Sequence, residues 1–319
     1  MDLRSLVRKS VFASCLYYLA DDWRFGRKLS RGDLETTSGT RHANSSVSVS
    51  VDYIRKVYND YRTYAGISKF RGIIGEIGPG DNFGVAMLLL ANGADAVHAI
   101  DRFYSKRDLS EQRHIYEALA AQENAATLFD GSPSEDTMRG LHYHPGIAAE
   151  DYFTRYGHHF DAILSRAVLE HLYDPISALT YMTNALKPGG RLVHRIDLRD
   201  HGMFAGHHSL TFLTISDSWY RRMTAQSGRP NRVLVNHYRN WLDQSSLNGE
   251  IRVTRLAGVD GEIQPSIWED IDQEQRNQAL DYVAHIQKRL TTTYRSIDPK
   301  DLAVAGIILI ATKPQANGT

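Results

Sequence analysis

The chain has 319 residues, 42% of them apolar, and its 37 lysines and arginines balance its 37 aspartates and glutamates. This length fits one large domain or one domain with a cap, and the apolar content excludes a wholly disordered chain. A formal net charge of zero argues against nucleic acid as the main partner, since nucleic-acid-binding domains usually carry a basic excess. Cys15 is the one cysteine, which excludes an internal disulfide and a cysteine-rich zinc site.

Residues 1–70 are predicted to form a mostly helical N-terminal cap. The apolar run 11–20, with Leu3, Leu6 and Val7 on the same side, predicts an amphipathic helix. A short signal peptide is the alternative, but no small-residue cleavage site follows the run. A second helical pattern ends near Gly66. No apolar run approaches the roughly 20 residues of a membrane span, so we expect a cytoplasmic protein without a membrane partner.

Residues 71–319 are predicted to form an α/β domain, because strand and helix patterns alternate from Gly72 onward. Helices are expected at 108–122 and after Ser132, where Glu135 completes a capping box. An insertion is expected at about 198–247. The predicted strands cover residues 73–77, 96–100, 141–144, 160–165, 191–196, 250–256 and 306–312.

The segment 76–84 predicts a site for a nucleoside-bearing cofactor. Glu76 ends a strand, Gly78 and Gly80 allow a tight turn, and Asp101 closes the next strand. A dinucleotide fold would carry a third glycine where Phe83 stands, and Asp81 would repel a pyrophosphate. These departures favour S-adenosyl-L-methionine (SAM), which has an amino group and a ribose but no phosphate. A purely structural strand–helix turn is the competing interpretation.

Three blocks in residues 72–196 resemble the class I SAM-dependent methyltransferases, in particular the small-molecule enzymes. The sequence Glu76-Ile-Gly-Pro-Gly80 is similar to the family's SAM-binding motif. The segment Phe160–Leu172 is similar to its fourth-strand signature, and Leu186–Leu192 to its turn into strand five. The resemblance implies a doubly wound, mostly parallel seven-stranded sheet whose last strand is antiparallel.

The resemblance also implies which residues bind SAM. Glu76 and the Gly78-Pro79-Gly80 turn would hold its methionine end, Asp101 its ribose, and Arg102 and Phe103 its adenine. Two further cofactor contacts are expected, at Glu150 and at Ser165. Glu150 would take the place of the acid that the family usually carries after strand three. Asn82 stands where the family has its third glycine, which puts the shape of this loop in doubt.

The acceptor is expected beyond strands four and five, under the cap. The catalytic candidates there are Arg166, His171, Asp200 and His201. His171 suits general base chemistry or a structural role in its loop, and Arg166 could clamp a carboxylate or phosphate or pair with a structural acid. A magnesium site at Asp197, Asp200 and His201 is weighed, but a polar loop is favoured, so no metal is predicted.

The sequence therefore predicts a SAM-dependent methyltransferase acting on a small molecule, with oxygen favoured as the methylated atom. A non-catalytic subunit of the same fold that binds a partner protein is the alternative. A nicotinamide-linked oxidoreductase is a weaker one. A homodimer is considered, but the sequence does not decide the oligomeric state.

Overall fold

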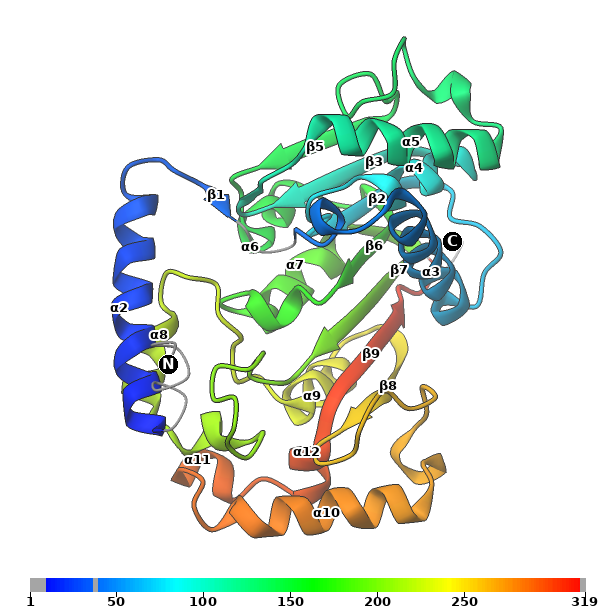
Figure 1. The fold of residues 1–319 in the computed structure, drawn as a ribbon. Helices are drawn as coiled ribbons and strands as arrows, with labels where there is room; N and C mark the ends of the chain where they lie inside the picture. Colours follow the sequence, from blue (N-terminus) through cyan, green and yellow to red (C-terminus); the bar gives the residue numbers. More distant parts are fainter. Residues whose placement is uncertain (1–9, 37–39, 316–319) are drawn as a thin grey trace.

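A seven-stranded sheet forms the centre of the computed structural model, which describes residues 10–36 and 40–315 (Figure 1). All neighbouring strands are parallel except β9, which pairs antiparallel with β7 and β8. This arrangement confirms the predicted sheet and its antiparallel last strand. In spatial order the strands are β5 (Leu141–Pro145), β3 (Ala94–Asp101), β2 (Gly72–Ile77), β6 (Phe160–Arg166), β7 (Leu186–Asp197), β9 (Val304–Thr312) and β8 (Asn248–Leu256).

Helices cover both faces of the sheet and enclose two apolar clusters. The first face packs under α3 (Val47–Ala65), α4 (Gly84–Ala91) and α5 (Leu109–Glu123). The other face carries α6 (Ala149–Tyr152), α7 (Pro175–Ala185), α9 (Val235–Gln244), α10 (Gln273–Gln287), α11 (Thr292–Arg295) and α12 (Pro299–Ala303). Strands with buried side chains on both faces need this double cover.

The two N-terminal helices lie in different places. Helix α3 packs on α4, α5 and the sheet, so its apolar stripe is part of the domain core. Helix α2 (Val11–Leu29) packs instead on α8 (Asp217–Thr224), which follows β7 (Figure 1). The predicted positions Leu3, Leu6 and Val7 fall outside the described residues. A short parallel pair, β1 (Glu35–Thr36) with β4 (Tyr104–Ser105), joins the cap to the segment that directly follows β3.

The helix ends follow local signals in the sequence. Ser46 caps α3, whose C-terminal Gly66 adopts φ +62°, and Asp108 and Asp174 cap α5 and α7. The expected helix after Ser132 is wrong, because residues 132–137 form turns and Glu135 pairs with Arg107 at 2.9 Å.

The segment between β7 and β8 contains an insertion and one helix that belongs to the α/β domain. It includes a 3₁₀ turn (Thr211–Thr214), α8 and α9. Helix α9 packs on α7, β8 and β9, so it serves as the crossover to β8, while residues 198–234 form the added part. Within the described ranges, no helix is long and apolar enough to cross a membrane.

Candidate functional site

The turn after β2 is tight and closely covered. Gly78 has φ +69° and Gly80 φ +74°, values that favour glycine, with Pro79 between them. The Gly78 N–H donates to the Ile100 carbonyl at 2.8 Å, which ties the turn to β3. A Cβ on Gly78 would lie 2.5 Å from Cγ2 of Val168, so the loop after β6 leaves no room for a side chain here.

Glu76 is a buried acid at the carboxyl end of β2. Its side chain is on the face covered by α3, and its Oε2 accepts no hydrogen bond from any described residue. Burial raises the pKa of Glu76 to about 8, because the charged form loses its water without gaining a partner. Such a carboxylate is suited to a cation that arrives from outside the chain.

Asp101 lies at the carboxyl end of β3, one strand away. Its Oδ1 accepts from the Phe103 N–H at 3.3 Å, and burial raises its pKa to about 7. Phe103 meets Phe25 of α2 edge-on at 5.3 Å, and Arg102 stacks over Tyr173 at 4.0 Å. Both side chains that were expected to flank an adenine therefore stand beside Asp101, packed against aromatic rings.

Glu150 and Ser165 are already engaged within the protein. Glu150 Oε1 accepts from the N–H groups of Tyr173 and Asp174, and its Oε2 is buried without a described partner. The Ser165 hydroxyl lies 2.8 Å from Nδ1 of His194, on the opposite face of the sheet from Glu76. Burial lowers the pKa of His194 to about 3.

Asp81 holds the cap over the glycine turn. Its Oδ2 accepts from the N–H groups of His42 at 2.9 Å and Ala43 at 3.1 Å. This contact fixes the adjacent Arg41, whose guanidinium lies 3.8 Å from the ring centre of Tyr53 in α3. Asp81, whose charge argued against a pyrophosphate ligand in the sequence, thus attaches the segment before α3 to the glycine turn.

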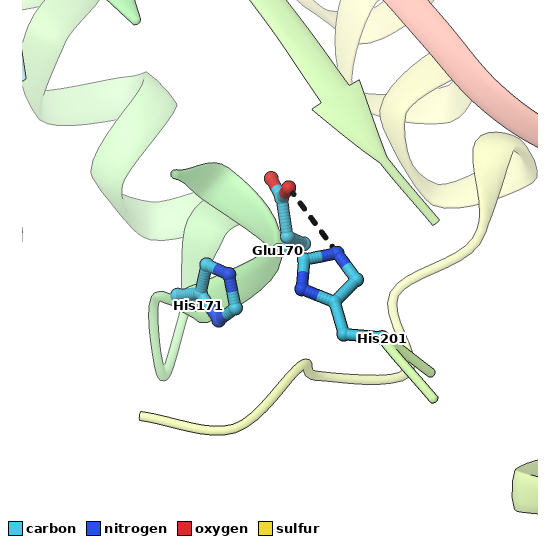
Figure 2. Close-up of side chains that lie close together, drawn as sticks. All are labelled: Glu170, His171 and His201. Carbon is cyan, nitrogen blue, oxygen red and sulfur yellow. Dashed lines mark ion pairs between the residues drawn. The ribbon is translucent and has the colours of Figure 1, made fainter. Parts of the chain in front are cut away.

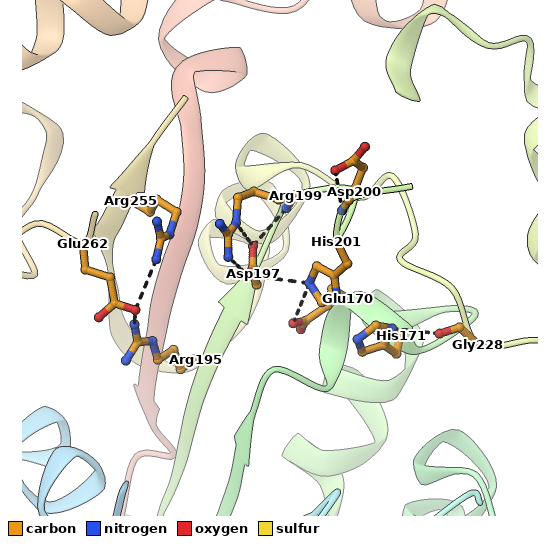
Figure 3. Close-up of polar contacts among 11 residues, drawn as sticks. Glu170, His171, Arg195, Asp197, Arg199, Asp200, His201, Gly228, Arg255 and Glu262 are labelled. Carbon is orange, nitrogen blue, oxygen red and sulfur yellow. Dashed lines mark hydrogen bonds and ion pairs between the residues drawn. The ribbon is translucent and has the colours of Figure 1, made fainter. Parts of the chain in front are cut away.

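A cavity of about 390 Å³ opens at the carboxyl ends of β6 and β7, where the acceptor was expected. Arg166 is in its wall and donates to Asp60 of α3 at 2.6 Å. Glu262 pairs with Arg195 and Arg255, and Asp197 with Arg199 (Figure 3). Six basic side chains and two acidic ones line the cavity, namely Arg41, Lys56, Arg166, Arg195, Arg199, Arg255, Asp197 and Glu262.

This excess of positive charge was not predicted from the sequence, because its members come from α3, β6, β7, β8 and the segment before α3. Even with Asp60 counted, six cations face three carboxylates. Among the tyrosines of α3, Tyr53 lines the cavity, while Tyr58 and Tyr61 are buried in the core.

His171 and His201 meet beside Asp197, which lines this cavity, while His171 itself lines a separate cavity of about 530 Å³. Their ring centres are 4.8 Å apart at 74°, and Glu170 lies beside them (Figure 2). Nδ1 of His171 is 2.8 Å from the Gly228 carbonyl, and Nε2 of His201 is 3.7 Å from Glu170 Oε1 and 3.6 Å from Asp197 Oδ2. The sequence indicated the two histidines but missed Glu170, although it directly precedes His171.

Glu170 is the more unusual member of this group. It is 1% exposed, and neither carboxylate oxygen forms a hydrogen bond in the part of the chain described. Burial raises its pKa, and the nearby backbone N–H groups of Glu170 and Asp197 offset part of that rise. Burial likewise lowers the pKa of His171 to about 4.

Asp200 is buried and caps a turn. Its two carboxylate oxygens accept from the N–H groups of Gly202 and Phe204, both at 2.9 Å. The turn presents His201 with φ +50°, and Ala167 before the His171 loop has φ +55°. Non-glycine residues in this region of backbone space are concentrated at functional sites. Arg166 and Asp197 therefore line the cavity, His201 and His171 lie next to each other beside Asp197, and Asp200 holds the turn that carries His201.

Residues 57–251, more than half of the chain, match a family described as a methyltransferase domain. No curated protein matches the sequence. Among solved structures, phosphoethanolamine N-methyltransferase 2 of Haemonchus contortus is 15% identical over 83% of this chain, with a TM-score of 0.42. The chain covers 53% of that structure's length.

Two similar structures have lengths closer to that of this chain. The YcgJ protein of Bacillus subtilis is 12% identical over 82% of this chain and 100% of its own, with a TM-score of 0.43. A methyltransferase bound to the Trm112 activator of Haloferax volcanii is 14% identical over 83% of this chain and 95% of its own, with a TM-score of 0.39. Similarities this distant say nothing about the acceptor. From the family match and the strand order, the chain belongs to the methyltransferase domain family, whose methyl donor is S-adenosyl-L-methionine.

Proposed function

We propose that the protein transfers a methyl group from SAM to an oxygen of a small molecule that carries an anionic group. The observation that carries the proposal is the position of Glu76. Its buried carboxylate has an oxygen without a partner in the described structure, and it adjoins a glycine turn too crowded for any side chain at Gly78. An ammonium group brought by the cofactor would neutralise it.

The chain's own residues fit the rest of the cofactor. Gly78, Pro79 and Gly80 would let the backbone approach its methionine end, and Asp101 would accept from the ribose hydroxyls. Arg102, Phe103 and Glu150 would border the adenine. The hydroxyl of Ser165 is committed to His194, so this residue would act through its backbone. When bound, SAM supplies an electrophilic methyl group on a positively charged sulfur.

The cavity beyond β6 and β7 supports an anionic acceptor. Its volume of about 390 Å³ suits a small molecule rather than a polymer such as nucleic acid. Arg166 is held by Asp60, and Arg41 by its stack on Tyr53, so both guanidiniums are ordered before the acceptor arrives. A carboxylate or phosphate would accept from guanidinium groups in bidentate geometry.

The transfer itself needs alignment more than covalent assistance. The acceptor oxygen bonds to the methyl carbon as the carbon–sulfur bond breaks, and the hydroxyl proton is released. We place the reacting hydroxyl on the Asp197 side of the cavity, next to His201 and His171. Asp200 acts as a positioning residue, because it holds the turn that presents His201.

Two measurements test the proposal. Calorimetric titration with S-adenosylhomocysteine (SAH) should show binding that Asp101→Ala weakens at least tenfold. Labelled-methyl transfer should then favour hydroxy acids and phosphate esters over their neutral esters. Arg166→Met should raise KM for the anionic acceptor about tenfold, while Arg252→Met, which removes an arginine paired with Glu250, leaves it unchanged.

The outcomes separate the alternatives. Absence of SAH binding would overturn the cofactor assignment, and equal rates for anionic and neutral acceptors would overturn the acceptor class. SAH binding without turnover on any acceptor or cell extract would instead support a non-catalytic subunit.

A further inference from the structure

We infer that Glu170, His171 and His201 form a binding site for one divalent transition-metal ion. One potential ligand atom from each residue lies within 4.8 Å of the others. Glu170 and His171 belong to the 3₁₀ turn Leu169–His171 after β6, and His201 to the loop after β7 (Figure 2). The carboxyl ends of neighbouring parallel strands thus bring together ligands that are distant in sequence.

The carboxylate of Glu170 is the first observation that points to a ligand. An acid that is 1% exposed normally pairs with a cation or accepts several hydrogen bonds, because water no longer solvates its charge. Here both oxygens are buried and form no hydrogen bond with the residues described. The carboxylate faces the two imidazoles, so a cation between the three side chains would satisfy it.

The orientation of His171 is the second observation. Its Nδ1 donates to the Gly228 carbonyl at 2.8 Å, which leaves the lone pair on Nε2. Histidines that bind metals usually donate their other ring N–H to a carbonyl or carboxylate in this way, which fixes the tautomer and the ring. The Gly228 loop is in turn held by Asp22 of α2, which accepts from the Gln226 and Ser227 N–H groups, both at 2.9 Å.

The separations suit a small ion. A tetrahedral ion with bonds of ~2.1 Å places its ligand atoms about 3.4 Å apart. Nε2 of His201 lies 3.7 Å from Glu170 and 3.6 Å from Oδ2 of Asp197, close to that spacing. The full set of Glu170, His171 and His201 spans up to 4.8 Å, so a side chain would have to move by up to about 1.4 Å to close the shell. Asp197 lies next to this group but is held by Arg199, which donates to both of its carboxylate oxygens, so a water molecule is the expected fourth ligand (Figure 3).

The ligand types identify the class of ion. Two imidazole nitrogens favour zinc, copper, iron or nickel over magnesium and calcium, which prefer oxygen ligands. Asp197 also lines the arginine-rich cavity, so the ion would lie at the cavity wall. If the proposed function holds, the ion would bind the acceptor oxygen and lower the pKa of its hydroxyl. The metal site itself does not depend on that function.

The test uses the full-length protein, treated with chelator and without SAM. Calorimetric titration with Zn²⁺ and with Ni²⁺ should show one bound ion per chain. Glu170→Gln and His201→Asn should each weaken binding at least tenfold. His144→Asn is the matched control, because His144 belongs to a second histidine group on β3 and β5, with its Nε2 3.2 Å from Nδ1 of His98. Its affinity should stay within about twofold of the wild type.

Two readouts on the unaltered protein guard against variants that fail to fold. Co²⁺ should produce visible absorption bands typical of mixed nitrogen and oxygen ligands, and saturating Zn²⁺ should raise Tm. Wild-type protein that binds none of these ions would overturn the inference. So would binding that His144→Asn abolishes and His201→Asn leaves intact. SAH titration of the same preparation reports separately on the proposed function.

Discussion

Glu76 and Asp101 are acids placed where burial opposes their charge. Their pKa values are raised to about 8 and about 7, so the free protein holds protons that ordinary carboxyl groups have lost at neutral pH. Buried acids with raised pKa values lower the stability of the folded chain. Such residues are concentrated at functional sites, where a ligand can supply the missing partner. In our proposal, the cofactor's ammonium and ribose hydroxyls supply the missing partners.

Glu76→Gln should therefore stabilise the free protein at the expense of cofactor binding. The pKa of Glu76 rises from 4.5 to about 8 on folding, so the wild type loses stability as pH rises through this interval. Glutamine keeps the shape without that loss. The Tm of the variant should exceed that of the wild type by ~2–5 °C at pH 8 and by little at pH 5. Differential scanning calorimetry across this pH range measures the difference.

Affinity for SAH completes this prediction. Glu76→Gln should weaken SAH binding at least tenfold, because an amide cannot neutralise an ammonium group. Wild-type affinity should rise between pH 6 and pH 8, as Asp101 and Glu76 release their protons. If the Tm of both proteins followed pH in parallel, or if SAH bound the variant normally, Glu76 would be a structural residue.

At the scale of elements, the cofactor turn and the loop after β6 act as one unit. Val168 lies over Gly78, and the next residues lead directly to Glu170 and His171. A change in the shape of the turn therefore displaces the loop that carries the proposed ligands.

Gly78→Ala should destabilise the protein by about 2 kcal/mol or more. Part of this cost, ~1–2 kcal/mol, is the positive φ, and the rest is the 2.5 Å approach to Val168. Gly32→Ala is the control, since Gly32 has φ +77° but no atom of the described residues within 4 Å of the added Cβ. Urea denaturation of both variants, and of the double variant Gly78→Ala/Val168→Ala, separates the cost of the positive φ from the cost of the contact with Val168. Equal losses for Gly78→Ala and Gly32→Ala would show that the contact is unimportant.

Helix α2 reaches the site through a loop. Asp22 is buried and accepts from the Ser227 hydroxyl at 2.7 Å as well as from the two backbone N–H groups of that loop. Asp22→Ala should cost about 1–3 kcal/mol of stability. It should also weaken Zn²⁺ binding about tenfold, because Gly228 would no longer orient His171. Asp33→Ala, which removes an exposed partner of Lys28, should change neither quantity.

For the whole molecule, charge is balanced overall but not locally. The formal net charge is zero, whereas the proposed acceptor cavity is strongly positive. Raising NaCl from about 0.05 M to about 0.5 M should increase KM for an anionic acceptor several-fold, because salt screens this local field. The Kd of SAH, which has no net charge, should change less than twofold. An acceptor KM that ignores salt would contradict binding by the arginines.

The sequence predicted what depends on neighbours along the chain. The strands, α3 and α5, and the turn at Gly78 followed from periodicity, caps and glycine spacing. The predicted helix after Ser132 was wrong. Glu135, which the capping box needed, forms an ion pair with the distant Arg107 instead. The cavity was missed for the same reason. Arg41 reaches it only because Asp81 holds the backbone at His42, a contact that no local pattern encodes.

The position of β8 and β9 late in the sequence bears on the order in which the protein is synthesised. Thr254, Arg255 and Gly306, on the last two strands, form one wall of the cavity, while the proposed cofactor residues end at Ser165. A ribosome therefore releases every proposed cofactor contact before it releases that wall. A nascent chain paused between these points could already hold the methyl donor but would have no complete place for an acceptor. Synthesis itself would impose the order in which the two ligands can first be bound.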